Sequence, residues 1–253
     1  MLVPPRDPAP NRAPISAPLG LSGALLCGGQ SRRMGQDKAR LLWRGRPLLL
    51  AGLSRLAAVA DELLLACGTP GRYADLLGDP RGAELPERYA GRPLREVCDR
   101  PRSAGDAPLG PLAGLEAALA AAQGEWVWVT SCDLPLLEPE LGQELLARAQ
   151  SEGADVALCA LPAPAGAGLL PEPLCAVYRS GVWSACRRAL DAGERRVLAW
   201  SGHAWEPPGE APRRPRSTLL PLEAARARAV FNLNTPEDLR ALESAPPGRE
   251  LSA

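Results

Sequence analysis

Apolar runs and amphipathic segments alternate along most of the chain. Short apolar runs indicate buried strands, and longer segments with apolar residues at helical spacing indicate helices. In the run at 125–130, E-W-V-W-V-T, the four central positions are all apolar, which is typical of a central parallel strand covered on both faces. The predicted strands are 23–27, 62–67, 96–99, 125–130, 155–161, 174–178 and 229–233. The predicted helices are 47–60, 111–122, 139–150, 181–190 and one that begins at Pro236.

This order of elements predicts an α/β protein, a three-layer Rossmann-like fold with a mostly parallel sheet. We expect a single domain over residues 19–243. Residues 1–18 hold six prolines and no apolar periodicity, so a disordered leader is expected there, and 244–253 is expected to be a flexible tail. The segment 206–221 is rich in proline and arginine. We expect it to be a surface loop whose arginines are either solvated or in contact with an anionic ligand.

The composition excludes several classes of function. Lys and Arg total 29 and Asp and Glu total 29, so the net charge is zero and neither nucleic acid nor an acidic membrane is an expected partner. A single histidine argues against a His-based triad and a multi-His metal site. The seven cysteines contain no C-x-x-C pair and predict buried free thiols. With no apolar run near the roughly 18–20 residues that span a bilayer, we expect a cytoplasmic protein.

The first candidate for chemistry follows the first predicted strand. Gly28 and Gly29 allow the backbone to approach a ligand closely, and Arg33 and Lys38 add positive charge nearby. This arrangement suits phosphate groups, although it matches neither the Walker A pattern nor the dinucleotide G-x-G-x-x-G pattern. An ordinary glycine turn followed by a solvated basic loop would explain the glycines alone.

Two carboxylates also lie at the ends of predicted strands, at the sheet edge where open α/β folds bind ligands. Asp133 comes directly after the apolar strand, and the next predicted helix begins several residues later, so it is not needed as a helix cap. Mg²⁺ is commonly held by one or two such carboxylates together with substrate phosphates and water. Asp99 could accept from a sugar or base, assist a metal, or pair with Arg100 or Arg102.

The last candidate lies near the C-terminal end of the predicted domain. Thr235 as N-cap, Pro236 at the first helical position and two acidic residues after it form a complete helix start and need no other function. Asn232 and Asn234 remain unexplained. On a strand their side chains share one face, which would give an amide pair near the carboxyl edge of the sheet.

Together, these segments resemble a known family. L-C-G-G-Q-S-R-R-M-G-Q-D-K at 26–38, G-P-L-A-G at 110–114, C-D-L-P at 132–135 and N-L-N-T-P-E-D-L at 232–239 occur in the order found in the molybdenum cofactor guanylyltransferases, a branch of the nucleotidyltransferase superfamily. A weaker likeness covers 173–178 and 192–196. The resemblance spans about residues 21–243.

The resemblance implies a Mg²⁺-dependent transfer of GMP from GTP to the molybdopterin-bound molybdenum cofactor, which gives molybdopterin guanine dinucleotide and pyrophosphate. It also implies delivery to molybdoenzymes or their chaperones. The nucleotide would be held by the backbone of Leu26, Cys27, Gly28 and Gly29 and by Asp99. Lys38 and Arg33 would stabilise phosphate charge, and Asp133 would bind Mg²⁺. The contacts implied on the acceptor side are Asn232, Asn234, Arg195 and Arg196.

The sequence departs from the family pattern in the length of the segment 206–221, which is longer than the family needs, and at two sets of residues. Cys27 stands where alanine is usual, and Ala66-Cys67-Gly68 stands where the family often has an asparagine that helps to hold the nucleotide. The second of these sets bears on base selectivity. The alternatives are a CTP-dependent molybdenum cofactor cytidylyltransferase, an enzyme that transfers a nucleotide to a sugar or polyol phosphate, and a non-catalytic nucleotide-binding assembly partner.

Overall fold

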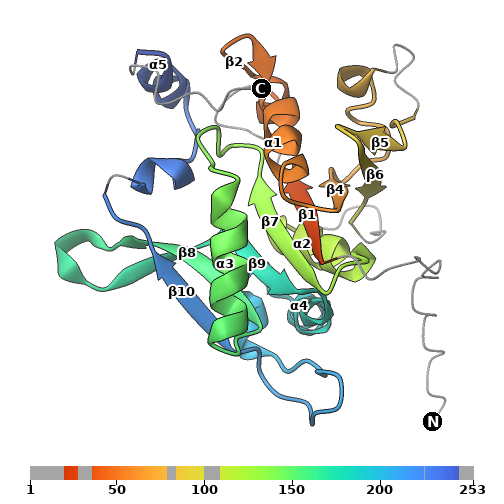
Figure 1. Cartoon of the computed structure of the whole chain (residues 1–253), viewed down its shortest axis with the longest axis vertical. Coiled ribbons are helices and arrows are strands. Elements are labelled where there is room, and N and C mark those ends of the chain that lie inside the picture. The colour runs from red at the N-terminus through yellow and green to blue at the C-terminus, as the bar shows by residue number, and fades with distance from the viewer. Residues whose placement is uncertain (1–19, 28–35, 79–83, 100–108, 225, 245–253) are drawn as a thin grey trace.

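The computed structural model describes residues 20–27, 36–78, 84–99, 109–224 and 226–244. Within this part of the chain an eight-stranded sheet has the order β10-β8-β9-β7-β1-β4-β6-β5 (Figure 1). Its strands are β1 (Leu21–Leu26), β4 (Glu62–Ala66), β5 (Arg88–Tyr89), β6 (Arg92–Val97), β7 (Trp126–Ser131), β8 (Val156–Pro162), β9 (Leu169–Arg179) and β10 (Ser217–Pro221). A separate hairpin consists of β2 (Leu42–Trp43) and β3 (Arg46–Pro47).

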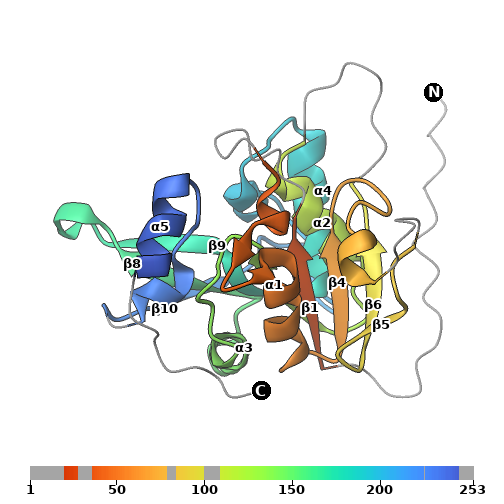
Figure 2. The same ribbon diagram turned by 90° about the horizontal axis from the view of Figure 1, so that it is seen from above.

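Helices cover both faces of this sheet (Figure 2). The covering helices are α1 (Leu48–Ala57), α2 (Pro111–Ala121), α3 (Glu140–Ser151) and α4 (Trp183–Asp191). The fifth helix, α5 (Pro236–Ser244), instead packs through Leu242 with Leu41, Trp43 and Leu48. In β7, Trp126 and Trp128 pack with α1 and α3, whereas Val127 and Val129 pack with α2 and α4. Because both faces of this strand are buried, its sequence shows no polar alternation. The predicted three-layer α/β fold is confirmed.

The centre of the sheet is parallel. Of the seven strand pairings in it, four are parallel and three, which involve β9 and β5, are antiparallel. The carboxyl ends of β7, β1, β4 and β6 therefore meet along one edge of the sheet. That edge is where ligands bind in open α/β folds.

The prediction of a strand at 229–233 is wrong. The chain there forms a 3₁₀ turn, Ala227–Val230, and then continues without a ladder partner. Its apolar residues are buried by other means. Leu233 is fully buried in a small cluster with Leu41, Trp43 and Leu48, and its N–H donates to the carbonyl of Asp133 over 2.9 Å.

The Pro- and Arg-rich segment 206–221 is more ordered than its composition suggests. Its last residues form β10, parallel to β8 at the sheet edge. The backbones of Arg213 and Trp205 form an isolated antiparallel β-bridge. The guanidinium of Arg213 donates to both carboxylate oxygens of the buried Asp155. Arg213 therefore forms an ion pair within the fold, in place of the two expected alternatives, a solvated side chain or a contact with an anionic ligand.

The described part of the chain contains no helix both long and apolar enough to cross a membrane. All seven cysteines are free, as predicted, and five of them are buried. The predicted leader and the tail beyond Ser244 lie outside the described residues.

The contact between α3 and β7 gives a first prediction. A Cβ at Gly142 would lie 2.6 Å from the indole ring of Trp128, far inside van der Waals distance. Gly142→Ala should therefore destabilise the protein by about 1–2 kcal/mol, even though alanine favours a helix by about 1 kcal/mol. Urea denaturation measures this loss. In a Trp128→Phe background, which provides room for the methyl group, the same substitution should cost much less; an equal cost in both backgrounds would contradict this packing.

Candidate active site

Three segments that are far apart in the sequence meet at the carboxyl end of β7. The ammonium of Lys38 lies 3.0 Å from Oδ2 of Asp133 and 2.7 Å from Oδ1 of Asn234, residues 95 and 196 positions away along the chain. The side chains of Lys38 and Asp133 are 15% and 19% exposed. One cation is thus held between a carboxylate and an amide oxygen at the sheet edge, in a partly desolvated position where its charge is only weakly screened.

Asp133 is held by contacts on several sides. The hydroxyl of Ser131, the last residue of β7, donates to its Oδ1, and its own carbonyl accepts from Leu233. The N–H of Cys132 donates to the carbonyl of Leu26 over 3.3 Å, which ties this turn to the end of β1. The strand-end position predicted for Asp133 is therefore confirmed, and its carboxylate is oriented toward Lys38.

The start of α5 holds Asn234 in place. Oδ2 of Asp238 accepts from the N–H groups of Asn234 and Thr235 over 2.8 and 2.7 Å, and the Thr235 hydroxyl accepts from the N–H of Asp238 over 3.2 Å. These reciprocal bonds form a capping box, and the predicted helix start is confirmed.

This cap gives a pH-dependent prediction. The N–H groups of Asn234 and Thr235 stabilise the carboxylate and hold the pKa of Asp238 below its usual value. A lowered folded-state pKa stabilises the fold above the usual pKa, about 3.9, and this contribution is lost as the pH falls through the lowered value. We expect NMR titration of the Asp238 carboxyl carbon to give that lowered pKa, and the amides of α5 to exchange faster below it. In Asp238→Asn this pH dependence should disappear; an unshifted pKa would contradict the capping geometry.

Asn232 and Asn234 do not form the amide pair that a strand would give. Asn234 contacts Lys38, whereas Nδ2 of Asn232 donates to Oε2 of Glu172 over 3.2 Å. Burial raises the pKa of Glu172. Glu172 was not a sequence candidate, and its position directly before the weak family likeness at 173–178 is the only signal that could have indicated it.

Asp99 lies two residues beyond the end of β6 and is half-buried. Strands β1 and β4 separate β6 from β7, so three strand spacings of about 4.8 Å put Asp99 roughly 14 Å along the edge from Asp133. Asp99 and the Lys38–Asp133 pair therefore occupy opposite ends of the same edge. This separation suits an elongated ligand with a base at one end and phosphates at the other.

Arg195 and Arg196 are exposed and lie in the loop after α4. The guanidinium of Arg195 donates to the carbonyls of Leu190 and Glu194 in its own neighbourhood. The Arg195 carbonyl would lie 3.3 Å from a Cβ placed on Gly110, which has a φ of +74°. The G-P-L-A-G segment and the loop of Arg195 are therefore adjacent, and a side chain at position 110 would be strained.

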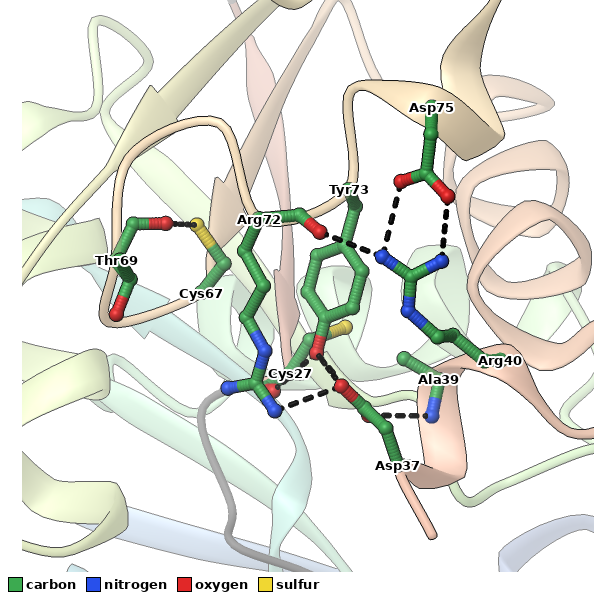
Figure 3. Close-up of polar contacts among 9 residues, drawn as sticks. All are labelled: Cys27, Asp37, Ala39, Arg40, Cys67, Thr69, Arg72, Tyr73 and Asp75. Carbon is green, nitrogen blue, oxygen red and sulfur yellow. Dashed lines mark hydrogen bonds and ion pairs between the residues drawn. The ribbon is translucent and has the colours of Figure 1, made fainter. Parts of the chain in front are cut away.

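Gly28, Gly29 and Arg33 lie outside the described residues. The two residues before them, Leu26 and Cys27, are buried at the end of β1, and the N–H of Cys27 donates to the carbonyl of Ala66 over 2.7 Å. The carbonyl of Cys27 accepts from the hydroxyl of Tyr73 (Figure 3). The backbone that leads into the candidate phosphate loop is thus fixed by β4 and by Tyr73.

The sequence patterns did not lead us to two features of the site. Tyr73 and Arg72 contact Asp37, the residue before Lys38. In addition, Lys38 is the only lysine among the 29 Lys and Arg residues of the chain. All the others are arginines. A single lysine, at a place where its ammonium fits between two oxygens, is a compositional signal that the sequence alone contains.

Among the residues that the structure describes, a cysteine–carboxylate set at the ends of β4 and β6 could also hold a metal. The ligand atoms of Cys67, Glu96 and Cys98 all lie within 4.8 Å of one another. Glu96 accepts from the N–H of Gly71 with both oxygens, and the thiol of Cys67 donates to Glu96 and to the carbonyl of Thr69. Burial and the contact with Glu96 raise the pKa of Cys67, which keeps the thiol protonated as a donor. These bonds fix the turn that leads to Arg72 and Tyr73.

Comparisons with known proteins identify the family of the chain. Residues 23–206 match the family model described as a MobA-like NTP transferase domain. A molybdenum cofactor guanylyltransferase from Burkholderia vietnamiensis is 34% identical over 232 residues, which cover 90% of this chain and 98% of that protein. A protein of the same name from Pseudomonas fluorescens is 34% identical, with 89% and 94% covered.

Solved structures share the fold. Molybdopterin-guanine dinucleotide biosynthesis protein A from Archaeoglobus fulgidus has a TM-score of 0.62 and 23% identity and covers 88% of this chain and 96% of its own. A 4-diphosphocytidyl-2C-methyl-D-erythritol synthase from Anaerococcus prevotii has the same TM-score and coverage at 13% identity. From the matched family model and its full-length relatives, the chain belongs to the family of MobA-like nucleotidyltransferases.

Proposed function

We propose that the protein transfers GMP from GTP to the terminal phosphate of the molybdopterin-bound molybdenum cofactor, and releases pyrophosphate. The observation that carries this proposal is the meeting of Lys38, Asp133 and Asn234 at the sheet edge. These residues come from three of the four segments by which the chain resembles molybdenum cofactor guanylyltransferases, and relatives of that name match it over nearly their full length.

The reaction requires little covalent chemistry from the protein. A phosphate oxygen of the acceptor attacks the α-phosphorus of GTP, the bond from that phosphorus to the bridging oxygen breaks, and pyrophosphate leaves with the electron pair. The attacking phosphate is already an oxyanion, so no strong general base is needed. Catalysis then depends on alignment and on charge stabilisation of the phosphates. Lys38 supplies that charge in this proposal.

The donor set at Asp133 fits Mg²⁺. The carboxylate is a hard oxygen ligand, and one of its oxygens already faces a cation, the Lys38 ammonium, at 3.0 Å. A single protein carboxylate with substrate phosphates and water is a common environment for Mg²⁺. When bound, the ion would neutralise developing negative charge on the phosphates. The protein residues hold Asp133 in place through Ser131 and Leu233.

The nucleotide would extend along the carboxyl edge of the sheet. Its phosphates would lie at Lys38, and its nucleoside end would reach toward Asp99, across the ends of β1 and β4. The backbone of Leu26 and Cys27, with the glycines that follow, would line the path. The acceptor would contact Asn232, Asn234, Arg195 and Arg196, and molybdoenzymes or their chaperones would receive the product.

The choice of the nucleotide base is the part of the proposal for which a related reaction is an alternative. The nearest alternative uses CTP to make the cytosine dinucleotide of the same cofactor, and Cys67 stands in the segment where the family often has a nucleotide-binding asparagine. Pyrophosphate release with Mg²⁺ and molybdopterin-loaded acceptor, measured with GTP and CTP side by side, separates them. Release with GTP alone supports the proposal. Preference for CTP would assign the protein to the cytidylyl branch, and nucleotide binding without release would favour a non-catalytic role.

A further inference from the structure

We propose that Tyr73 is a positioning residue of this enzyme, which acts through Asp37 to hold the ammonium of Lys38 against Asp133. Tyr73 lies in none of the segments by which the chain resembles its family. The inference rests on the proposed function for its effect on catalysis. Its effect on the position of Lys38 is measurable without any substrate.

The hydroxyl of Tyr73 joins the two ends of the candidate phosphate loop. Tyr73 is fully buried, and its hydroxyl lies 3.0 Å from the carbonyl of Cys27 and 3.1 Å from Oδ2 of Asp37. Cys27 is the last described residue before that loop, and Asp37 is the second one after it. Burial raises the pKa of Tyr73, so the phenol keeps its single proton, which these two acceptors share.

Asp37 transmits this contact to Lys38. Its Oδ1 accepts from the N–H of Ala39 over 3.1 Å and so caps the 3₁₀ turn Lys38–Arg40. Lys38 is the first residue of that turn. Because the turn is only three residues long, its orientation depends on the cap and on the side chains that anchor it.

Arginines on both sides complete the anchor. Arg72 pairs with Oδ2 of Asp37 at 2.7 Å, and Arg40 pairs with both oxygens of Asp75 at 2.6 and 2.9 Å (Figure 3). The guanidinium carbons of Arg72 and Arg40 lie 5.2 and 5.6 Å from the centre of the Tyr73 ring, within cation–π range.

The side chains of the short turn and its cap therefore contact two different parts of the protein. Asp37 and Arg40 attach it to the segment 72–75, whereas Lys38 contacts Asp133 and Asn234. Tyr73 is the group in this anchor that also reaches the end of β1. Loss of its hydroxyl should leave the core intact and allow the turn, with Lys38, to move.

Because the chain has a single lysine, the mobility of the Lys38 side chain can be measured. Lys38 carries the only side-chain amine of the chain, so its acylation by a small activated ester can be followed by peptide mass spectrometry as one site. In Tyr73→Phe we expect the acylation rate to rise about three- to tenfold, because the ammonium leaves its partners more often. Asp37→Asn, which retains a capping oxygen and weakens the pairing with Arg72, should act in the same direction.

Tyr89→Phe is the matched control. Its hydroxyl also joins several groups, namely Leu50, Ser54 and Arg46, but it lies at α1 and β5, away from the site. This variant should leave the acylation rate of Lys38 unchanged. An unchanged rate in Tyr73→Phe, or an equal rise in both variants, would overturn the positioning role.

Kinetics supply the second measurement. With Mg-GTP and loaded acceptor, Tyr73→Phe should lower kcat about tenfold and change the KM for GTP by less than about threefold, because a displaced charge costs most in the transition state. In a Lys38→Met background the same substitution should have little further effect on the residual rate. Equal losses in both backgrounds would show that Tyr73 acts independently of Lys38. If the wild type releases no pyrophosphate, the proposed function fails, while the acylation result still decides the positioning role.

Discussion

Replacement of Asp133 by asparagine is expected to lower kcat at least about a thousandfold while the protein remains folded. The substitution keeps the size of the side chain and removes the charge that would hold Mg²⁺ at the transferring phosphates, an interaction that matters most in the transition state. Asp133 is partly exposed, and its backbone contact with Leu233 does not depend on the side chain. Steady-state pyrophosphate release and a thermal melt measure the two effects separately.

Glu138→Gln provides the matched control. Glu138 lies five residues further along the same connection, is also partly exposed, and pairs with Arg226 at 2.9 Å. Its replacement removes a nearby paired carboxylate that is more exposed than Asp133, at 43% against 19%, without touching the site, so turnover should stay within about twofold of wild type, as for a surface substitution. Near-normal activity in Asp133→Asn would contradict the metal assignment, and an equal loss in both variants would indicate a general effect of charge.

Substitution of Lys38 should cost about a hundred- to a thousandfold in kcat/KM for GTP, and arginine should not rescue it. Lys38→Met removes the charge that the proposal assigns to the phosphates. Lys38→Arg keeps the charge, but a planar guanidinium cannot replace a compact ammonium that lies within 3.0 Å of both Asp133 and Asn234. We therefore expect arginine to recover less than about a tenth of the lost activity.

The amino-acid composition makes the comparison of lysine with arginine at position 38 informative. The chain has arginine at every other basic position, so a lysine at 38 has no compositional explanation. Comparison of Lys38→Arg with Lys38→Met separates the need for a charge from the need for an ammonium. Full activity in Lys38→Arg would show that any cation suffices and would remove Lys38 from the proposed alignment of the phosphates.

The fold was predictable where a local pattern records burial. The apolar run at β7 and the amphipathic helices beside it reflect a strand buried on both faces, and this determined the three layers. The segment 229–233 has the same apolar character, but Ala229 and Val230 are buried in the main core, and Leu233 is buried beside Trp43 of the β2–β3 hairpin. No local pattern records these tertiary contacts. In 206–221 the prolines suggested a loop, whereas tertiary pairing with β8 makes the last five residues, Ser217–Pro221, an edge strand.

The site was predictable in part for a similar reason. Strand ends are local features, so Asp133 and Asp99 could be expected at the carboxyl edge. The contact of Asn234 with Lys38 spans 196 positions and depends on burial of Leu233 and on the α5 cap, neither of which fixes a partner in the sequence. Tyr73 lies in a segment without a family motif, and only its contacts in the structure link it to Asp37.

The most direct test of the central claim follows the α-phosphate of the nucleotide. The protein is incubated with Mg²⁺, molybdopterin-loaded acceptor and GTP labelled at either the α- or the γ-phosphate, and the pterin fraction is separated from small phosphates. The account predicts that the α-label appears in the pterin product and the γ-label in pyrophosphate, in equal amounts. Both labels remaining in GTP, or a γ-label released as inorganic phosphate with no α-label on the pterin, would contradict it.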